Sequence, residues 1–312
     1  MKSLAKDLLL LFTLISASVL VNGQLNISVS VPIIGQLNIS TSIPINDQLN
    51  IQVYNPQNEG IFPVASSFIS NQHDAILFDA QFSTIDGEKV LQMIKTSNKT
   101  LKQIIITCGD PDMYFGLEPI VEAYPNISIV ATPRVVNRIN QTKDYKLSIW
   151  GPKLKEGTPK KIYLPVASNE TKFTLGHQTF EIKSGDKYSA YVWIESYKTI
   201  FGGTGLFWGI HAFSADTQTV ESRADWRQVL KEMIALKPKR VIPGHYLGEV
   251  PAGDESIKFS LKYLEEFEKV LKKNNYKNST AVIADMKELY PNLGSEISLE
   301  LSAKVNTGEM KF

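Results

Sequence analysis

The most constraining feature of the sequence is the alternation of short apolar runs with amphipathic segments from residue 75 onwards. Short apolar runs predict buried strands, and apolar residues three or four positions apart predict helices. The expected strands are residues 75–78, 103–107, 127–131, 162–164, 173–175, 179–182, 190–195, 199–201 and 240–242. The expected helices are residues 86–96, 117–123, 135–139, 226–236, 257–273 and 280–289. Strand–helix units, then hairpins, then strand–helix units again indicate an α/β domain in which two sheets are flanked by helices.

The N-terminus has the pattern of a secretory signal peptide over residues 1–23. Lys2 and Lys6 precede an apolar run from Leu8 to Val21, and small residues follow near the expected cleavage site. This run is shorter than the roughly 20 residues needed to span a bilayer. No later apolar run is comparable. We therefore expect a cleaved signal, a secreted, extracellular mature chain and no stable membrane span.

A short repeat occupies residues 24–52, between the signal peptide and an expected domain over residues 53–312. The segment that begins at Gly23 recurs at Gly35 and at Asp47, which gives a period of 12 residues. Polar and apolar residues alternate within each copy, as they do in a strand. Three copies are too few for a solenoid. The alternatives are a duplicated stalk and a small adhesion or oligomerisation element.

Asn-x-Ser/Thr tripeptides occur along the whole chain, and each can accept an N-linked glycan in a eukaryotic secretory pathway. The acceptor residues are Asn26, Asn38, Asn98, Asn126, Asn140, Asn169 and Asn278. Such tripeptides also arise by chance. Together with the signal peptide they predict a secreted glycoprotein.

Composition limits the chemistry that is available to the chain. The 33 basic and 32 acidic residues give a net charge of +1, whereas nucleic-acid binders usually carry a basic excess. Cys108 is the single cysteine, which excludes an intramolecular disulfide and a Cys-x-x-Cys zinc ribbon. Because there are only 4 histidines, any metal site has to use carboxylates. Neither a Gly-x-Ser-x-Gly elbow nor a Gly-x4-Gly-Lys-Ser/Thr phosphate loop occurs.

The residues with most chemical potential follow the expected strand at 103–107, in a loop that precedes a helix. This loop resembles the metal-binding loop of the metallo-β-lactamase superfamily, which reads Thr-His-x-His-x-Asp-His. Cys108 and Asp110 stand at the first two histidine positions, and Asp112 keeps the aspartate. Met113 replaces the third histidine.

Further landmarks follow in the order typical of that superfamily and extend the resemblance over about residues 50–312. A strand that ends at Asp79 comes first, and Asp186 stands at the histidine of a Gly-His-Thr segment. Thr204 stands at the aspartate that bridges two metals, and His245 keeps the last histidine. The resemblance implies an αββα four-layer sandwich with its site at one sheet edge.

The resemblance also implies a hydrolase whose metal ligands are substituted. The first metal position would take Cys108, Asp110 and Asp186, all of which can bind zinc. The residues at the second position, Asp112 and His245 among them, form a poorer set of metal ligands. The thioether of Met113 is a poor ligand, and the neutral Thr204 does not bridge as a carboxylate does. The pattern is compatible with one zinc or other divalent ion, and also with no metal.

If one metal is retained, the resemblance implies hydrolysis of an ester, lactone or amide by metal-bound hydroxide. Asp112 is then the candidate orienting or basic residue. Tyr114 and His211 are candidate pocket residues that contact the substrate, beside Met113 and Thr204. Each motif residue also has a structural interpretation, such as helix capping by the aspartates or burial of Cys108 at a strand end.

Without a metal, three aspartates in one pocket favour another counter-ion, because like charges at close range raise the pKa of at least one carboxyl. Lys187 and His245 are the candidates. The alternative is an open, solvated loop that tolerates the charges. The second functional hypothesis is a catalytically inactive secreted protein. It would bind a small molecule or a protein in the pocket that corresponds to the active site of the superfamily. Its candidate lining residues are Phe207, Trp208, His211 and Tyr246. A bound metal distinguishes the two hypotheses.

Overall fold

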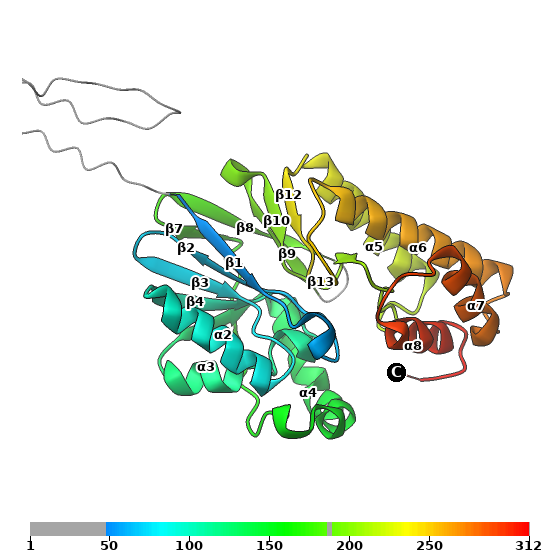
Figure 1. Ribbon diagram of the computed structural model, residues 1–312, viewed down its shortest axis with the longest axis horizontal. Coiled ribbons are helices and arrows are strands. Elements are labelled where there is room, and N and C mark those ends of the chain that lie inside the picture. Colours follow the sequence, from blue (N-terminus) through cyan, green and yellow to red (C-terminus); the bar gives the residue numbers. More distant parts are fainter. Residues whose placement is uncertain (1–47, 186–188, 312) are drawn as a thin grey trace, which may run out of the picture. The chain divides into compact units, whose positions relative to one another are not determined.

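Figure 1 shows the computed structural model of the protein, which describes residues 48–185 and 189–311. The predictions that lie outside these residues are the signal peptide, the repeat up to residue 47, Asn26, Asn38, Asp186 and Lys187. The described residues belong to one compact unit that begins at Gln48. Its first strand, β1, begins at Asn50, so the third repeat copy runs into the sheet.

The first sheet contains the strands of the N-terminal half in the order β1-β2-β3-β4-β5-β6. The first two pairings are antiparallel and the following three are parallel. The strands are β1 (Asn50–Tyr54), β2 (Ser66–Ser70), β3 (Asp74–Phe78), β4 (Thr100–Ile106), β5 (Ser128–Ala131) and β6 (Val166–Ala167). The helices α2 (Thr84–Ser97), α3 (Leu117–Ala123) and α4 (Pro133–Leu154) lie together on one side of this sheet (Figure 1).

The second sheet has the order β12-β10-β9-β8-β7, in which only β10 and β12 are parallel. Its strands are β7 (Lys172–Leu175), β8 (Gln178–Ser184), β9 (Ala190–Ile194), β10 (Thr199–Phe201) and β12 (Arg240–Ile242). A short parallel pair, β11 (Phe207–Trp208) and β13 (His245–Tyr246), lies beside it. The helices of this half are α5 (Val220–Ala235), α6 (Glu255–Lys273), α7 (Ser279–Leu289) and α8 (Glu296–Asn306).

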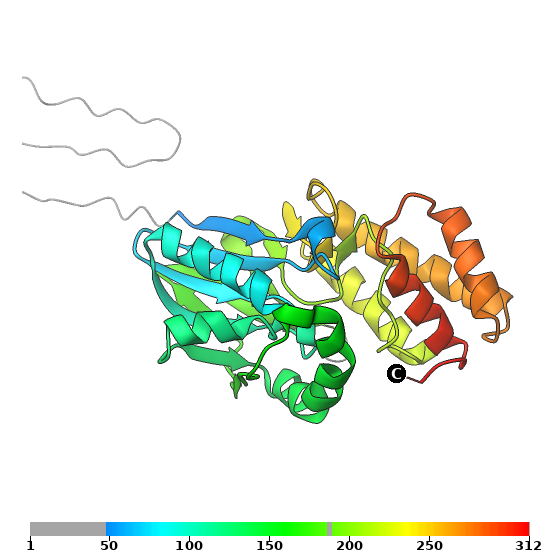
Figure 2. The ribbon, with the colours of Figure 1, turned by 60° about the horizontal axis from the view of Figure 1, so that its bottom comes forward.

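Three clusters of buried apolar side chains define four layers. Between the sheets, the ring of Phe78 lies 5.9 Å from that of Phe180 and 4.9 Å from that of Phe201, measured between centroids. A second cluster joins the outer face of the first sheet to α2, α3 and α4. A third joins the second sheet to the C-terminal helices, which form the opposite outer layer in Figures 1 and 2. The architecture is the predicted αββα sandwich.

Several elements differ from the sequence prediction. Residues 162–164 form no strand. Ile162 and Tyr163 pack instead against the buried cluster between the first sheet and its helices. The strand that pairs with β5 is Val166–Ala167. The helix expected at 135–139 is the start of the much longer α4, which Thr132 caps by accepting a hydrogen bond from the backbone of Val135. Helix α8 and strands β2, β11 and β13 are additions to the expected elements, and α5 begins at Val220 rather than at residue 226.

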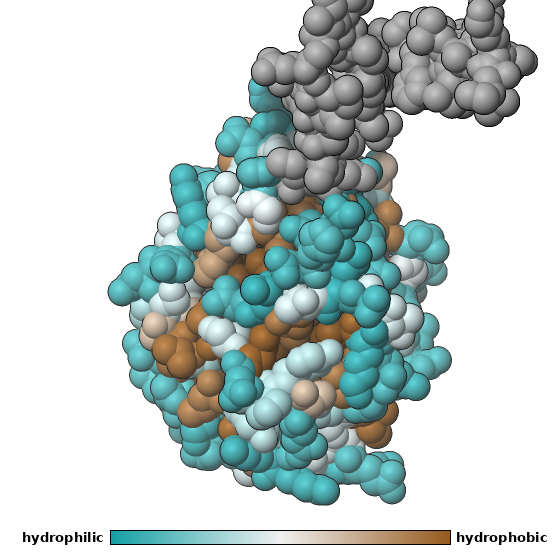
Figure 3. All heavy atoms as spheres, turned by 90° about the vertical axis from the view of Figure 1, so that its left-hand side faces the viewer, coloured by the Kyte–Doolittle hydropathy of each residue, from teal (hydrophilic) through white to brown (hydrophobic). Residues whose placement is uncertain are grey.

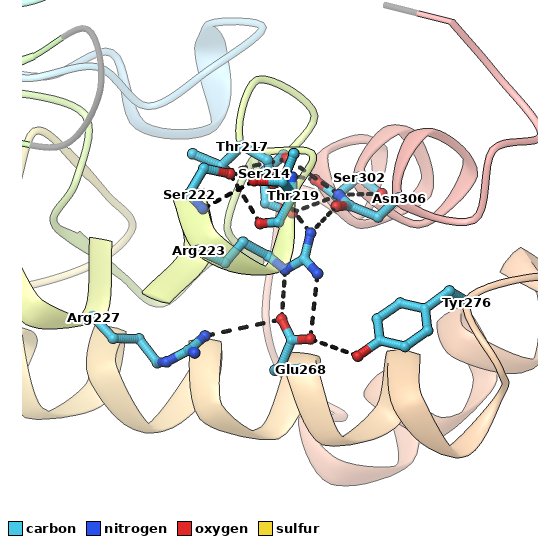
Figure 4. A network of polar contacts seen from close by, with 10 residues as sticks. All are labelled: Ser214, Thr217, Thr219, Ser222, Arg223, Arg227, Glu268, Tyr276, Ser302 and Asn306. Atoms are coloured by element: carbon cyan, nitrogen blue, oxygen red, sulfur yellow. Dashed lines mark hydrogen bonds and ion pairs between the residues drawn. The ribbon is translucent and has the colours of Figure 1, made fainter. Parts of the chain in front are cut away.

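A buried ion network joins α5, α6 and α8 (Figure 4). The guanidinium of Arg223 donates to Glu268 at 2.6 Å and to the side chain of Asn306. Tyr276 donates to the same carboxylate at 2.8 Å. Burial alone raises the pKa of Glu268, but these hydrogen bonds outweigh it and hold the pKa below its usual value.

Hydrophilic side chains (teal) predominate on the face shown in Figure 3, with apolar ones (brown) in bands between them. Such a mixture is usual for the surface of a folded domain. In the described part of the chain, no helix is both long and apolar enough to cross a membrane.

Candidate functional site

The ends of four strands bring the sequence motifs to one edge of the sandwich. β3 ends before Asp79, and the parallel β4 ends before Thr107 and Cys108. β10 ends before the turn that contains Thr204, and the parallel β12 ends before Pro-Gly-His245. Parallel neighbours end on the same side of a sheet, so motifs that are far apart in sequence become adjacent.

Asp79 and Thr107 fasten the loops beneath the site. The carboxylate of Asp79 accepts from the backbone N–H of Thr107 at 2.7 Å and from its hydroxyl at 2.6 Å. That hydroxyl accepts in turn from the backbone N–H of Gly203 at 2.7 Å. Burial raises the pKa of Asp79 to about 7, although the hydrogen bonds from Thr107 act in the opposite direction.

Two glycines allow the strand ends to approach closely. A β-carbon at Gly244 would lie 1.8 Å from the backbone oxygen of Gly203, which no side chain could tolerate. Gly203 itself has a φ of 73°, in the left-handed region that favours glycine. Because Gly244 has no side chain, its backbone can lie against that of Gly203, which places His245 beside the loop after β4.

The central contact of the site joins the two most distant motifs. Nε2 of His245 lies 2.6 Å from Oδ2 of Asp112. The thiol of Cys108 lies 3.5 Å from Oδ2 of Asp110, to which it donates, and 3.4 Å from the hydroxyl of Thr204. The structure thus brings together Cys108, Asp110, Asp112, Thr204 and His245, as the resemblance implied.

These residues line a pocket with a cavity volume of about 80 Å³. Apolar rings form much of its wall, and charged side chains gather near the β4 loop. The lining residues include Phe62, Phe82, Cys108, Asp110, Asp112, Lys146, Trp150, Thr204, Phe207, His211, Ala212, Asp216, Trp226 and His245. Trp150 comes from α4 and Trp226 from α5, so helices of both outer layers contribute to the wall.

A buried lysine lies among the acidic residues of the pocket. Nζ of Lys146, whose side chain is only 4% exposed, lies 3.3 Å from Oδ2 of Asp216 and 3.8 Å from Oδ1 of Asp110. Arg138 binds the other oxygen of Asp216 at 2.5 Å. Burial and the Asp216 charge raise the pKa of Asp110 to about 7, while Lys146 acts to lower it. α4 thus supplies internal cations to the acidic pocket.

His211 lies at the pocket wall and is almost fully buried. Its Nδ1 lies 3.0 Å from the hydroxyl of Tyr263 on α6. Burial lowers the pKa of His211 to about 4. The imidazole is therefore neutral near pH 7 and provides a polar, uncharged contact.

Met113 and Tyr114 do not line the pocket, which corrects the sequence prediction. Both are fully buried in the core between the first sheet and its helices. The backbone N–H of Ala80 donates to the carbonyl of Met113, which turns this part of the loop inward. Trp208 and Tyr246 are also absent from the residues that line the pocket.

The described residues do not fit the metal centre that the resemblance implied. Zinc sites in proteins usually have three or four protein ligands. Within residues 48–185 and 189–311, no three His, Cys, Asp or Glu side chains are arranged to hold a metal ion. His245 and Asp112 are within hydrogen-bond distance of each other, and the ammonium of Lys146 forms an ion pair with Asp110.

Sequence reasoning missed Lys146, Asp216 and several aromatic residues of the pocket. One usable signal was present, because Lys146 and Trp150 continue the helical face that begins with Val135 and Ile139, all of which are buried. Asp216 had no such signal. It meets Arg138 across 78 positions of sequence.

No protein-family model matches the chain, and no curated protein matches it. Several solved metallo-β-lactamases are similar in structure. The DIM-1 enzyme exposed to ceftazidime has 16% identity and a TM-score of 0.47, covering 72% of this chain and 95% of its own. TMB-1 has 19% identity and a TM-score of 0.43, covering 70% and 99%. VMB-1 at pH 5.5 has 16% identity and a TM-score of 0.43, covering 70% and 92%.

These similarities are too distant to transfer an activity. The layers, the strand order and the position of the loops at the sheet edge are properties of this chain itself. On these grounds the protein has the αββα architecture that the sequence resemblance implied, with its candidate site at one edge of the sheets.

Proposed function

We propose that the protein binds a small organic molecule in the pocket between α4, α5 and the β4 loop, and that it does so without a catalytic metal. The observation that carries the proposal is the combination of an aromatic wall with a polar end whose charges are balanced by Lys146. Pockets of this kind, mostly apolar with a few converging polar groups, are typical of small-molecule sites.

The aromatic wall supports this proposal. The rings of Phe62, Phe82 and Trp150 contact one another at centroid distances of 5.4 to 5.6 Å. Phe207 and Trp226 form a second pair at 6.1 Å. These packed rings give the pocket a preformed shape, which reduces the conformational entropy that the protein loses when a ligand binds.

Two of the lining residues are tryptophans, so binding can be measured by fluorescence and confirmed by calorimetry on the full chain. We expect small aromatic compounds to change the tryptophan emission with saturation. Ala212→Leu, which fills the pocket, should weaken binding at least about tenfold, or about 1.4 kcal/mol. Ala224→Leu on the exposed surface of α5 is the matched control and should bind as the wild type does. Equal affinities of both variants would refute the assignment of the pocket.

A second candidate function is hydrolysis by the Asp112–His245 pair, because a carboxylate that orients an imidazole is a frequent general-base arrangement. The contact of 2.6 Å at the pocket favours it. His245 would accept a proton from water, and Asp112 would hold the ring in place. Turnover of esters and lactones by the wild type, lost in Asp112→Ala, is the expected result under this alternative. Turnover that persists in Asp112→Ala would remove the pair from the mechanism.

We also propose that the protein is exported and glycosylated. Among the described residues, all predicted acceptors are exposed, namely Asn98, Asn126, Asn140, Asn169 and Asn278. Exposure is what a glycan at these positions requires. Expression in a eukaryotic host should give secreted protein whose mass falls on treatment with an N-glycosidase. Retention in the cytosol with an unchanged mass would contradict the proposal.

A further inference from the structure

We propose that the N-linked glycan of Asn126 packs into the groove beside its acceptor, where its first sugar lies on the ring of Tyr124. This inference rests on the glycosylation proposed above and adds the protein surface that the glycan covers. It follows from the turn that carries Asn126, from the groove that this turn borders and from the apolar groups that the groove presents.

A tight turn holds the acceptor in place. Helix α3 is followed by Tyr124, whose backbone N–H donates to the carbonyl of Ile120 at 2.9 Å. The carbonyl of Tyr124 accepts from the backbone N–H of Ile127 at 3.0 Å, which closes a four-residue turn before β5 begins at Ser128. Pro125 occupies the second position of this turn, which its fixed φ favours. Hydrogen-bonded backbone therefore fixes the chain on both sides of the acceptor.

The groove beside this turn contains both the acceptor and an aromatic ring. It is an open hollow of about 420 Å³ between the first residues of β4 and the turn. Its lining residues are Thr100, Leu101, Lys102, Ala123, Tyr124, Pro125, Asn126 and Ile127. Because Tyr124 precedes the acceptor by only two residues and lines the same groove, its ring is within reach of a sugar attached to Asn126.

The groove presents apolar groups that a sugar can cover. Ala123 and Pro125 are exposed, whereas Tyr124 and Ile127 are half-buried and pack partly against the core beneath α3. One face of a pyranose ring carries mainly C–H groups. Packing this face on aromatic and aliphatic surface removes apolar area from water, while the hydroxyls of the sugar stay solvated.

This setting distinguishes Asn126 from two acceptors that resemble it. Asn98 lies near the same end of β4, but only Thr100 of its tripeptide lines the groove. Asn278 also follows a tyrosine by two residues, but the hydroxyl of Tyr276 donates to the ion network shown in Figure 4. We therefore assign the groove to the glycan of Asn126.

The groove lies away from the candidate ligand pocket. The parallel strands β4 and β5 begin beside it, whereas the loop with Cys108 and Asp110 follows the opposite end of β4. A glycan packed here leaves the pocket open. It covers exposed apolar side chains that would otherwise be available for contacts with other proteins.

The experiment is a double-mutant cycle on the full chain secreted from a eukaryotic host. The four proteins are the wild type, Tyr124→Leu, Asn126→Gln and the double variant. Leucine keeps an apolar side chain against the core but has no aromatic face. Site-resolved mass spectrometry establishes whether Asn126 carries a glycan, and thermal unfolding gives the melting temperature of each protein.

We expect Tyr124→Leu to lower the melting temperature by at least about 2 °C more when Asn126 is glycosylated than in the Asn126→Gln background. Asn140→Gln is the matched control, because it removes a predicted acceptor from the exposed surface of α4. In that background Tyr124→Leu should have the same effect as in the wild type.

A second measurement keeps the inference testable if Tyr124→Leu is not secreted. Treatment with an N-glycosidase should lower the melting temperature of the wild type by at least about 2 °C more than that of Asn126→Gln. Asn140→Gln should respond as the wild type does.

The results that would overturn the inference differ in what they leave standing. An equal effect of Tyr124→Leu in both backgrounds, with the glycan present at Asn126, would reject the packing of the glycan but retain glycosylation. Glycans at other acceptors and none at Asn126 would reject this site alone. A secreted protein without any glycan would contradict the proposed glycosylation itself.

Discussion

Lys146 is the residue that most alters the expected chemistry of this site. A basic residue as counter-ion to the clustered aspartates was anticipated from the sequence, but the structure supplies Lys146 and Arg138 from α4. The same aspartates in a metal centre would be balanced by a divalent ion. Here a side chain of the protein carries that charge, which makes the arrangement testable by substitution.

We expect Lys146→Met to lower the free energy of unfolding by about 3 kcal/mol, because Asp110 loses the cation beside it and Asp216 keeps only Arg138. Lys143→Met on the same helix should cost less than about 1 kcal/mol, since Lys143 pairs with the exposed Asp144 at the protein surface. Chemical denaturation measures both. Equal stability of the two variants would show that Lys146 does not balance the pocket.

Asp79 gives a pH dependence with a defined sign. Its pKa is about 7 in the folded protein, against an ordinary value of 3.8 for an exposed aspartate in the unfolded chain. Between these two pH values the folded protein holds a proton that the unfolded chain releases. Protonation therefore stabilises the fold below pH 4, and this contribution is lost as the pH rises towards 7.

The stability of the wild type relative to Asp79→Asn should fall between pH 4 and pH 7 and then stay level. Denaturation curves at several pH values measure this difference, in which the contributions of other groups largely cancel. Parallel stability profiles would contradict the raised pKa of Asp79.

At the level of elements, α4 explains why the site was only partly predicted. The strand ends at Asp79, Cys108 and His245 were readable because short apolar runs stop at polar residues. The 22-residue α4 was recognised only at its start, because its later turns are largely polar. Lys146 and Trp150 were therefore not assigned to the pocket.

The network between α5, α6 and α8 allows a prediction at the same scale. Arg223→Met should lower the free energy of unfolding by about 2–3 kcal/mol, since the half-buried Glu268 would lose its main partner. Arg227→Met, whose guanidinium lies 3.9 Å from the same carboxylate, should cost less than about 1 kcal/mol. Thermal or chemical unfolding compares the pair. A larger loss at Arg227 would contradict the assigned roles.

For the whole molecule, the two sheets and their helical covers were predictable from the order of apolar segments. The pocket was less so, because it depends on contacts between distant segments, such as Arg138 with Asp216. The aromatic wall has the same origin, with Phe62 and Phe82 before the first helices and Trp226 on α5. Local patterns carry no information about which of these residues meet.

The central claim is that Lys146, and not a metal ion, balances the acidic charges of the site. Its most direct test is metal analysis of the purified full-length protein, with thermal unfolding in EDTA and in added zinc. A ligand that binds only the folded state raises the melting temperature. We expect no stoichiometric zinc and the same melting temperature in both conditions. One tightly bound zinc per chain, whose removal by EDTA lowers the melting temperature, would contradict this central claim.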